Sequence, residues 1–209
     1  YKLNMSGIQD ILTNIIFFFV SIFIFIFSIG PDKQTISIIG VGILWTLLLL
    51  SSTLSLRKFY QDDFENGNLL IIHLNGFSFG FIAILKTFSH FFFVQVPFLL
   101  SIPIASILLN ITDDKLIYLF LSFGMGSLIL SCLGSISSSM NLMNQRNFLL
   151  GSVIVMIFSV PIIIFSVGIV NLEENFNSLI SILFGILLIV FAINPWASGL
   201  CLKLSLENN

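Results

Sequence analysis

The chain alternates between six long apolar segments and short polar connections. A membrane-spanning α-helix needs roughly 20 mostly apolar residues. All six segments reach that length, and no linker or tandem repeat separates them. We therefore expect an all-α, polytopic membrane protein with one transmembrane domain over residues 1–209. The predicted spans are residues 11–29, 36–56, 79–109, 116–140, 148–170 and 179–202.

Composition supports this class and excludes others. Hydrophobic residues make up 57% of the chain and charged residues 9%, whereas a soluble domain carries about 25% charged residues. The net charge of −2 is spread over short connections, so we expect no nucleic-acid partner. Cys132 and Cys201 lie far apart in apolar stretches. We interpret them as small buried hydrophobes rather than as a disulfide or a metal site.

Basic residues in the connections predict the orientation. If the N-terminus is cytoplasmic, the other side holds only Lys33 and Lys115. The cytoplasmic side then holds Lys2, Arg57, Lys58, Lys86, Arg146 and Lys203. This bias follows the positive-inside rule. We therefore expect both termini on the cytoplasmic or matrix side of an inner membrane, either bacterial or mitochondrial.

The cytoplasmic segment of residues 57–76 is the main candidate for a partner contact. Basic residues after Leu56 suit both a helix C-terminus and anionic headgroups. Acidic residues and two aromatic residues one turn apart follow, and Asn66-Gly67 is a helix-stop and turn signal. We interpret the segment either as a solvated loop or as a docking helix for a soluble subunit. The candidate docking residues are Arg57, Lys58, Tyr60, Asp62, Asp63, Phe64, Glu65 and Gly67.

Two ionisable residues on the third span are a second candidate site. Lys86 and His90 are four residues apart and so share one helix face. An ionisable group in a span is costly and suggests function, although Lys86 is close enough to the cytoplasmic end to extend toward the headgroups. Three interpretations of His90 remain: a haem or metal ligand, a proton relay, or a hydrogen bond to a neighbouring helix.

The fourth span carries a stripe of serines at four-residue spacing: Ser127, Ser131, Ser135 and Ser139. Small residues at this spacing allow close helix packing, and serines can hydrogen-bond between helices. We interpret the stripe as a packing surface, with the lining of a polar cavity as the alternative. Gly76 and Gly80 form a weaker small-residue pair. Pro97, Pro103 and Pro195 predict kinks.

The sequence lacks the motifs of several enzyme classes. It contains no GxxxxGK[ST] phosphate loop and no HExxH. We therefore expect a membrane component without enzymatic activity, for which any energy comes from another subunit.

Several blocks of residues resemble one known family. They are Ser28-Ile29-Gly30-Pro31, Gly42-Ile43-Leu44-Trp45, Leu50-Ser51-Ser52, Asp62-Asp63 with Gly67, and Lys86 with His90. Their order and spacing resemble the cytochrome c maturation permease family CcmB, also called haem exporter protein B. The resemblance covers essentially the whole chain. The sequence departs from the family pattern after Gly67, where it has Leu69-Leu70 instead of a leucine followed by an acidic residue.

The resemblance implies an ABC exporter-type permease subunit that pairs with a separate ATPase, CcmA. It also implies the membrane partners CcmC and CcmD and, indirectly, the haem chaperone CcmE, with haem handed over or transported rather than firmly bound.

We rank three hypotheses for the role of this chain. In the first, the segment from Arg57 to Gly67 couples the ATPase to the spans. In the second, the chain is a scaffold without transport, and its serine stripe is an assembly surface. In the third, haem crosses with His90 as a transient ligand.

Overall fold

The computed structural model describes residues 5–30, 32–56, 59–143, 149–171 and 175–207. Within these ranges the chain is helical apart from short turns and contains no strand. Six of the helical segments are long and apolar enough to cross a membrane. The predicted all-α, polytopic class is therefore confirmed.

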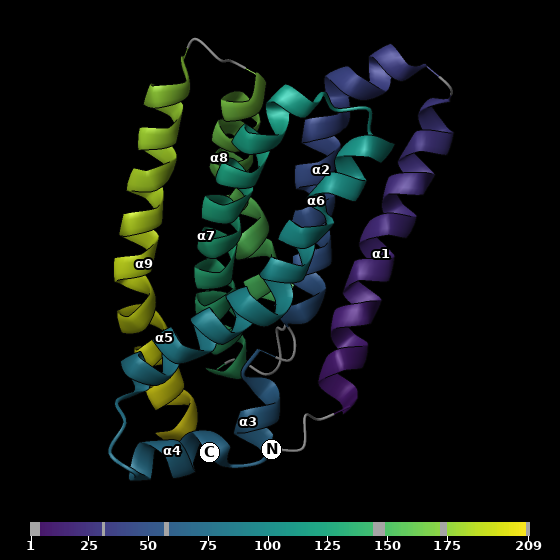
Figure 1. Ribbon diagram of the computed structural model, residues 1–209. Helices are drawn as coiled ribbons and strands as arrows, with labels where there is room; N and C mark the ends of the chain where they lie inside the picture. Colours follow the sequence, from purple (N-terminus) through teal and green to yellow (C-terminus); the bar gives the residue numbers. More distant parts are fainter. Residues whose placement is uncertain (1–4, 31, 57–58, 144–148, 172–174, 208–209) are drawn as a thin grey trace.

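The helical elements follow one another with short connections (Figure 1). They are α1 (Met5–Ile29), α2 (Lys33–Ser55), α3 (Gln61–Glu65), α4 (Asn68–Leu74), α5 (Phe79–His90), the π-helix η2 (Phe91–Gln95), α6 (Val96–Leu108), the 3₁₀-helix η3 (Asp113–Lys115), α7 (Leu116–Met143), α8 (Leu149–Asn171) and α9 (Phe176–Glu207). The third span is the continuous α5–η2–α6. The largest differences from the predicted ends are at α1, which begins at Met5 instead of residue 11, and at α9, which continues past Leu202 to Glu207, because a helix can extend beyond the apolar part of its span.

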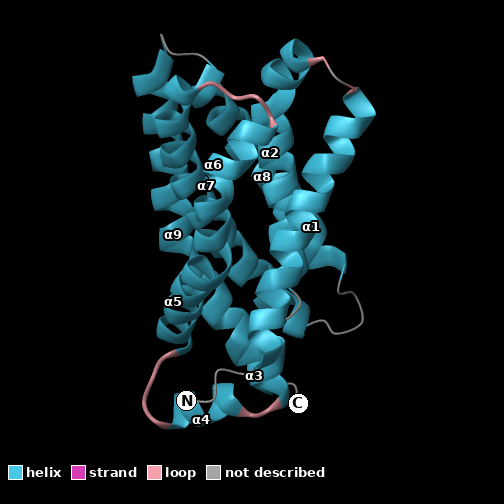
Figure 2. Ribbon diagram, turned by 45° about the vertical axis from the view of Figure 1, so that its right-hand side comes forward, coloured by secondary structure: helices cyan, strands magenta, loops and turns pink. Residues whose placement is uncertain are grey.

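The helix α7 lies at the centre of the bundle. It packs against α8 and α9 and also contacts α5, α6 and η2. The helix α1 lies at one edge and packs mainly on α2 and α6 (Figure 2). The short helices α3 and α4 lie at the same end of the bundle as the start of α1 and the end of α9 (Figure 1).

The turn between α1 and α2 lies at the opposite end. Gly30 closes α1 with a positive φ of 89°, a conformation that glycine adopts at little cost. Asp32 caps α2, because its carboxylate accepts hydrogen bonds from the Thr35 hydroxyl and, at 3.1 Å, from the Gln34 backbone N–H. Together these hydrogen bonds hold the pKa of the Asp32 carboxylate below its usual value, and the hydrogen bond from Thr35 contributes most.

The third span changes its hydrogen-bond pattern in the middle. Pro97 lies in the first turn of α6 but in the interior of the continuous α5–η2–α6 span, where a proline clashes with the carbonyl four residues earlier. The backbone adapts with a π turn, in which the Val96 N–H bonds the Phe91 carbonyl. Sequence predicted a kink at this proline, and the structure has a π-helix just before it. Figure 1 shows α5 slanting from the foot of α9 toward the middle of the bundle, where α6 continues toward α1.

Candidate functional site

The predicted docking segment forms two short helices joined by a turn. Gly67 lies between α3 and α4 with a φ of +70°, so the predicted helix stop and turn are found at this glycine. Arg57 and Lys58, which we assigned to the docking surface, lie outside the described residues. The remaining candidates divide into side chains that face the bundle and side chains that face outward.

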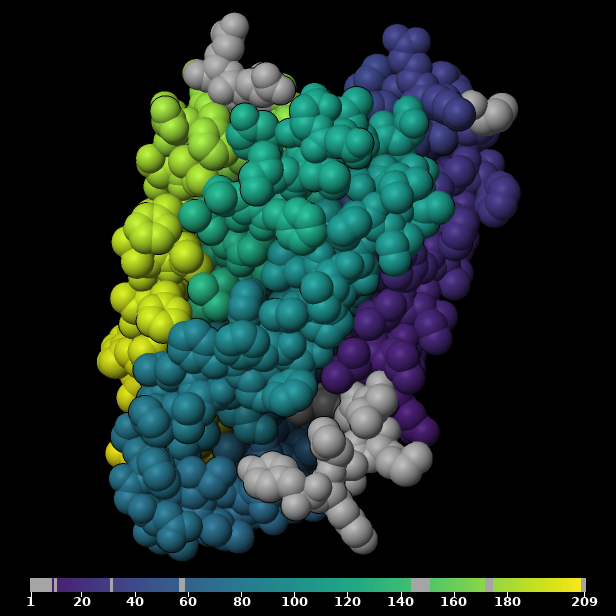
Figure 3. All heavy atoms as spheres, viewed as in Figure 1, coloured from purple at the N-terminus to yellow at the C-terminus, as the bar shows by residue number. Residues whose placement is uncertain are grey.

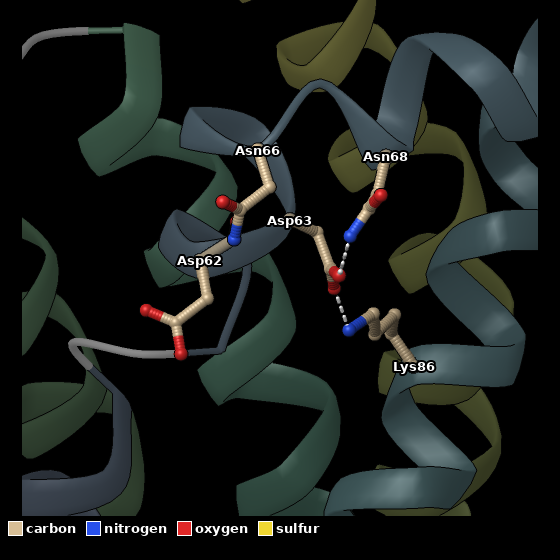
Figure 4. A network of polar contacts seen from close by, with 5 residues as sticks. All are labelled: Asp62, Asp63, Asn66, Asn68 and Lys86. Atoms are coloured by element: carbon tan, nitrogen blue, oxygen red, sulfur yellow. Dashed lines mark hydrogen bonds and ion pairs between the residues drawn. The ribbon is translucent and has the colours of Figure 1, made fainter. Parts of the chain in front are cut away.

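Asp63 and Lys86, predicted as members of two separate sites, form one ion pair (Figure 4). The Asn68 side-chain amide also donates to Asp63 at 3.3 Å. The Lys86 and Asp63 side chains are only 32% and 23% exposed, so water screens the pair less than it would on an open surface. The pair therefore ties α3 and the start of α4 to α5, well inside the third span.

Tyr60 corrects one of our predictions. The side chain is fully buried, and its hydroxyl lies 2.7 Å from the Ser135 hydroxyl on α7. Burial raises the pKa of Tyr60 well above its usual value, and the Ser135 hydrogen bond offsets this only in part. A fully buried neutral phenol cannot contact a partner, so the assignment of Tyr60 to the docking surface was wrong. It anchors the segment to α7.

The Phe64 side chain also faces the helix bundle. It is half-buried and packs against the hydrophobic core. The aromatic pair that we expected on a partner-facing side therefore lies on the inner side of α3. This orientation follows from the apolar surface of the bundle end, which two aromatic side chains cover.

The outward side of α3 is acidic. Asp62 and Glu65 are exposed, as are Gln61 and Asn66, and we call these four residues the acidic face. The Gln61 amide donates to the Glu65 carboxylate at 2.7 Å, and the Asn66 amide donates to the Asp62 carbonyl at 2.6 Å. Figure 4 shows the Asp62 carboxylate directed away from Lys86. Within the acidic face, the Glu65 carboxylate is thus hydrogen-bonded to Gln61, and all four side chains are open to a partner.

The helix α4 adds an apolar surface beside the acidic face. Leu70, Ile71 and Leu74 are 46%, 56% and 76% exposed. Figure 3 shows that α4 and the start of α5 form the outer surface at this end of the molecule. His73 closes the following turn, since its Nδ1 lies 2.9 Å from the Phe77 carbonyl and its ring stacks on Phe79. An exposed apolar helix at the end of a membrane bundle suits the lipid interface.

His90 lies inside the bundle, 8% exposed. Its Nε2 is 2.8 Å from the Ser55 hydroxyl on α2, and its Nδ1 is 3.1 Å from the Ser131 hydroxyl on α7. The Phe59 ring lies against the imidazole with the ring centroids 4.8 Å apart. Of the three interpretations, the geometry agrees with a histidine that hydrogen-bonds to neighbouring helices, because both ring nitrogens are engaged.

A second set of polar contacts runs from Tyr60 across three helices. Beyond Tyr60, the Ser135 hydroxyl lies 3.1 Å from the Ser198 hydroxyl, which donates to the side-chain carbonyl oxygen of Asn194 at 2.9 Å. The Asn194 amide donates to the Thr87 hydroxyl at 2.8 Å. We call this series, Tyr60–Ser135–Ser198–Asn194–Thr87, the polar chain. Sequence analysis missed Thr87, Ser198 and the amide of Asn194, although polar side chains inside apolar spans were a signal.

The serine stripe of α7 is packed inside this chain's own bundle. Ser127, Ser131, Ser135 and Ser139 are all buried. The predicted packing stripe is therefore confirmed, and its alternative use as an external assembly surface is contradicted.

The close small-residue contact lies elsewhere than predicted. Gly76 has a φ of +95° and forms the turn before α5, so Gly76 and Gly80 do not share a helix face. Gly80 instead meets α9: a Cβ at Gly199 would lie 2.9 Å from the Gly80 nitrogen. The small pair that brings two backbones together is Gly80 with Gly199.

Comparison with known proteins identifies the family of this chain. A protein named heme exporter protein B from Haemophilus influenzae is 29% identical over 210 residues, which cover 99% of this chain and 95% of that protein. The protein of that name from Bradyrhizobium diazoefficiens is 27% identical over 200 residues, covering 94% and 90%. The one from Paracoccus denitrificans is 32% identical over 135 residues, covering 65% and 62%. The sequence model described as CcmB protein matches residues 1–205. The chain therefore belongs to the CcmB family of ABC-type permeases.

Proposed function

We propose that this chain is the permease subunit of a haem exporter-type ABC complex in cytochrome c biogenesis. In this proposal residues 1–209 act as one transmembrane domain, which receives mechanical work from a separate, CcmA-like ATPase. The family and the relatives named heme exporter protein B support the haem-exporter role. The absence of a phosphate-binding loop from the sequence supports the placement of the ATPase on another subunit.

The observation that carries the coupling role is the attachment of the acidic face to the spans. Asp63 is paired with Lys86 on α5, and Tyr60 is bonded to Ser135 on α7. A partner that moves α3 therefore displaces α5 and α7 through two specific contacts. The acidic face, with Asp62 and Glu65, offers that partner complementary charge, which favours docking of a basic surface.

Charge distribution supports a cytoplasmic position for α3 and α4. In the sequence, the side predicted to be cytoplasmic carries six basic residues, Lys2, Arg57, Lys58, Lys86, Arg146 and Lys203, whereas the other side carries only Lys33 and Lys115. The positive-inside rule therefore supports a cytoplasmic position for the acidic face and for both termini. This is the ATP-containing side, where a soluble ATPase subunit would meet the acidic face.

The remaining partners follow from the family. CcmC-like and CcmD-like membrane proteins would complete the complex, with the haem chaperone CcmE as an indirect partner and the lipid bilayer around the spans. We regard haem as a molecule handed over or transported rather than as a resident cofactor. The hypothesis of His90 as a transient haem ligand ranks lower, because both ring nitrogens already contact serines. The scaffold hypothesis loses its proposed assembly surface, since the serine stripe is buried.

Charge reversal of the acidic face tests the coupling role. The double variant Asp62→Arg/Glu65→Arg changes only exposed side chains and leaves the Asp63–Lys86 pair intact. We expect at least a tenfold loss of the co-purified ATPase subunit, which corresponds to about 1.4 kcal/mol of binding free energy, and a matching loss of mature cytochrome c.

The matched control is Asp113→Arg/Asp114→Arg, which reverses two exposed carboxylates at the opposite end of the bundle. This control should retain the ATPase. Full recovery of both the ATPase and cytochrome c with the Asp62/Glu65 variant would refute the coupling role.

A further inference from the structure

Six side chains have buried polar atoms without a hydrogen-bond partner in the described part of the chain, and three of them lie on α2 and η2. These three are Trp45 and Ser51 on α2 and Gln95 on η2. Gln95 is the most unusual, because it is fully buried and both its amide nitrogen and its carbonyl oxygen are unpaired. Buried polar groups of native proteins are almost always paired with protein or ordered water.

These side chains continue the polar contacts of His90 deeper into the membrane. Gln95 follows His90 by five residues, which is one turn of the π-helix between them. Ser51 lies one α-helical turn from Ser55, whose hydroxyl contacts His90. The elements that carry these residues meet here, because α2 and α7 both pack against η2.

Local backbone contacts satisfy the neighbouring serines but not Ser51. The Ser52 hydroxyl donates to the Leu49 carbonyl at 3.0 Å, and the Ser55 and Ser131 hydroxyls lie 2.6 and 3.0 Å from the Ser52 and Ser127 carbonyls. Because a neutral imidazole has one donor and one acceptor, one of these two serines donates to His90 and the other to its backbone carbonyl. Ser51 has no such contact within the described residues. Its hydroxyl is therefore available to a group that lies between the helices.

Chemistry selects water as that group. An unpaired amide in a hydrocarbon environment is strongly unfavourable, and a buried water typically makes two to four hydrogen bonds. The Gln95 amide supplies both donors and an acceptor, while Ser51 and Trp45 add a hydroxyl and an indole N–H. All of these groups are neutral, which suits water better than an ion.

We infer that α2, η2 and α7 hold ordered water against Gln95 and Ser51, inside the membrane and next to His90. The π turn provides the site, because it brings Gln95 around one turn after His90 instead of leaving it on another side of a regular helix. Functional sites often lie at such π turns. The polar region of the bundle then extends beyond His90, and Trp45 lies at its deeper limit.

A stability comparison tests this inference in the full chain, purified in lipid nanodiscs. Gln95→Leu removes the amide and keeps a side chain of similar size. If water is bound, the substitution takes away its partners, and we expect the thermal midpoint to fall by about 2–4 °C, the shift typical of one lost hydrogen bond in a chain of this length. If the site is dry, removal of an unpaired amide raises the midpoint, and a rise would overturn the inference.

Thr87→Val is the matched control on the same span, because Thr87 accepts a hydrogen bond from Asn194. It should lower the midpoint in either case and so shows that the assay detects one buried hydrogen bond. A cryo-electron microscopy map that resolves ordered water supplies an independent measurement. Water density within hydrogen-bond distance of the Gln95 amide supports the inference, and apolar contacts alone around that amide would overturn it.

Discussion

The two halves of the bundle are held together by different forces. In the half that contains α3 and α4, directional contacts join the helices: the Asp63–Lys86 pair, the His90 contacts with Ser55 and Ser131, and the polar chain. In the other half, the contacts between helices are mainly apolar. Phe18 on α1 meets Phe98 on α6 with ring centroids 5.4 Å apart, and Trp45 meets Phe123 at 4.8 Å.

This difference matters for a coupling subunit. A hydrogen bond fixes both distance and direction, whereas apolar contacts are non-directional and depend on area and shape. The half that we propose receives work from a partner is therefore joined as a unit, and the opposite half can shift while it retains its contacts. Four experiments test this contrast, in order of decreasing effect.

The largest effect is expected from Gly126→Ala in the apolar half. A Cβ at this position would lie 2.2 Å from the buried ring of Trp45, so the ring must move. We expect a loss of roughly 1–3 kcal/mol in unfolding free energy, measured by denaturation in mixed detergent micelles. Gly124→Ala on the same helix is the control, because nothing lies within 4 Å of its Cβ. It should be neutral or stabilising by up to about 1 kcal/mol, and equal effects at both glycines would contradict shape-dependent packing here.

Tyr60→Phe tests the polar half. It removes the hydroxyl that contacts Ser135 and should cost about 1 kcal/mol of unfolding free energy. The raised pKa of Tyr60 also predicts a pH dependence. Folding keeps the phenol neutral, so its contribution is complete below the ordinary tyrosine pKa of about 10 and is lost as the pH rises further.

The measurement is the unfolding free energy of both proteins between neutral and alkaline pH. The wild type should lose more stability than Tyr60→Phe as the pH is raised. Tyr118→Phe, at the other end of the bundle and half-buried, serves as the control for loss of a tyrosine hydroxyl. Parallel pH curves for wild type and Tyr60→Phe would argue against a neutral, bundle-anchoring phenol.

A smaller effect is expected from the ion pair. We predict a coupling free energy of about 0.2–1 kcal/mol between Asp63 and Lys86, because both side chains remain partly exposed. A double-mutant cycle with Asp63→Asn and Lys86→Met measures it. Either single variant should also speed amide hydrogen exchange in α3. Additive effects in the cycle, with unchanged exchange, would show that the pair does not hold the docking segment.

The smallest effect is expected from Ser137→Ala. Within the part of the chain that the structure describes, the buried Ser137 hydroxyl has no partner, so its removal should be neutral or slightly stabilising. Ser131→Ala, by contrast, removes a contact with His90 and should cost about 0.6 kcal/mol, a typical value for a hydrogen bond between membrane helices. Equal losses in unfolding free energy would mean that the contact between Ser131 and His90 adds nothing to stability.

The spans could be predicted from the sequence because length and apolarity alone determine whether a helix crosses a membrane. The docking segment could be located for a similar reason, since charges appear abruptly after Leu56. Which side of this segment faces the bundle could not be predicted. The spacing of Tyr60 and Phe64 places both on one side of a helix, but which side faces the bundle depends on Ser135, 75 residues away.

The same limit applies within the membrane. His90 could be recognised as unusual, but its role depends on Ser55 and Ser131, which lie 35 and 41 residues away in the sequence. Pro97 predicted a break in the helix without indicating how the backbone would adapt. A π turn, a kink and an unwound segment all accommodate proline, and the packing of α2 and α7 around η2 selects among them.

The third span connects opposite edges of the protein. Its first part packs on α9 and carries Lys86, whereas its last part packs on α1 through Phe98. In the proposed coupling role it would connect the docking segment to the most distant helix, with the π turn at its centre. Work delivered to α3 would then reach α1 across the bilayer plane.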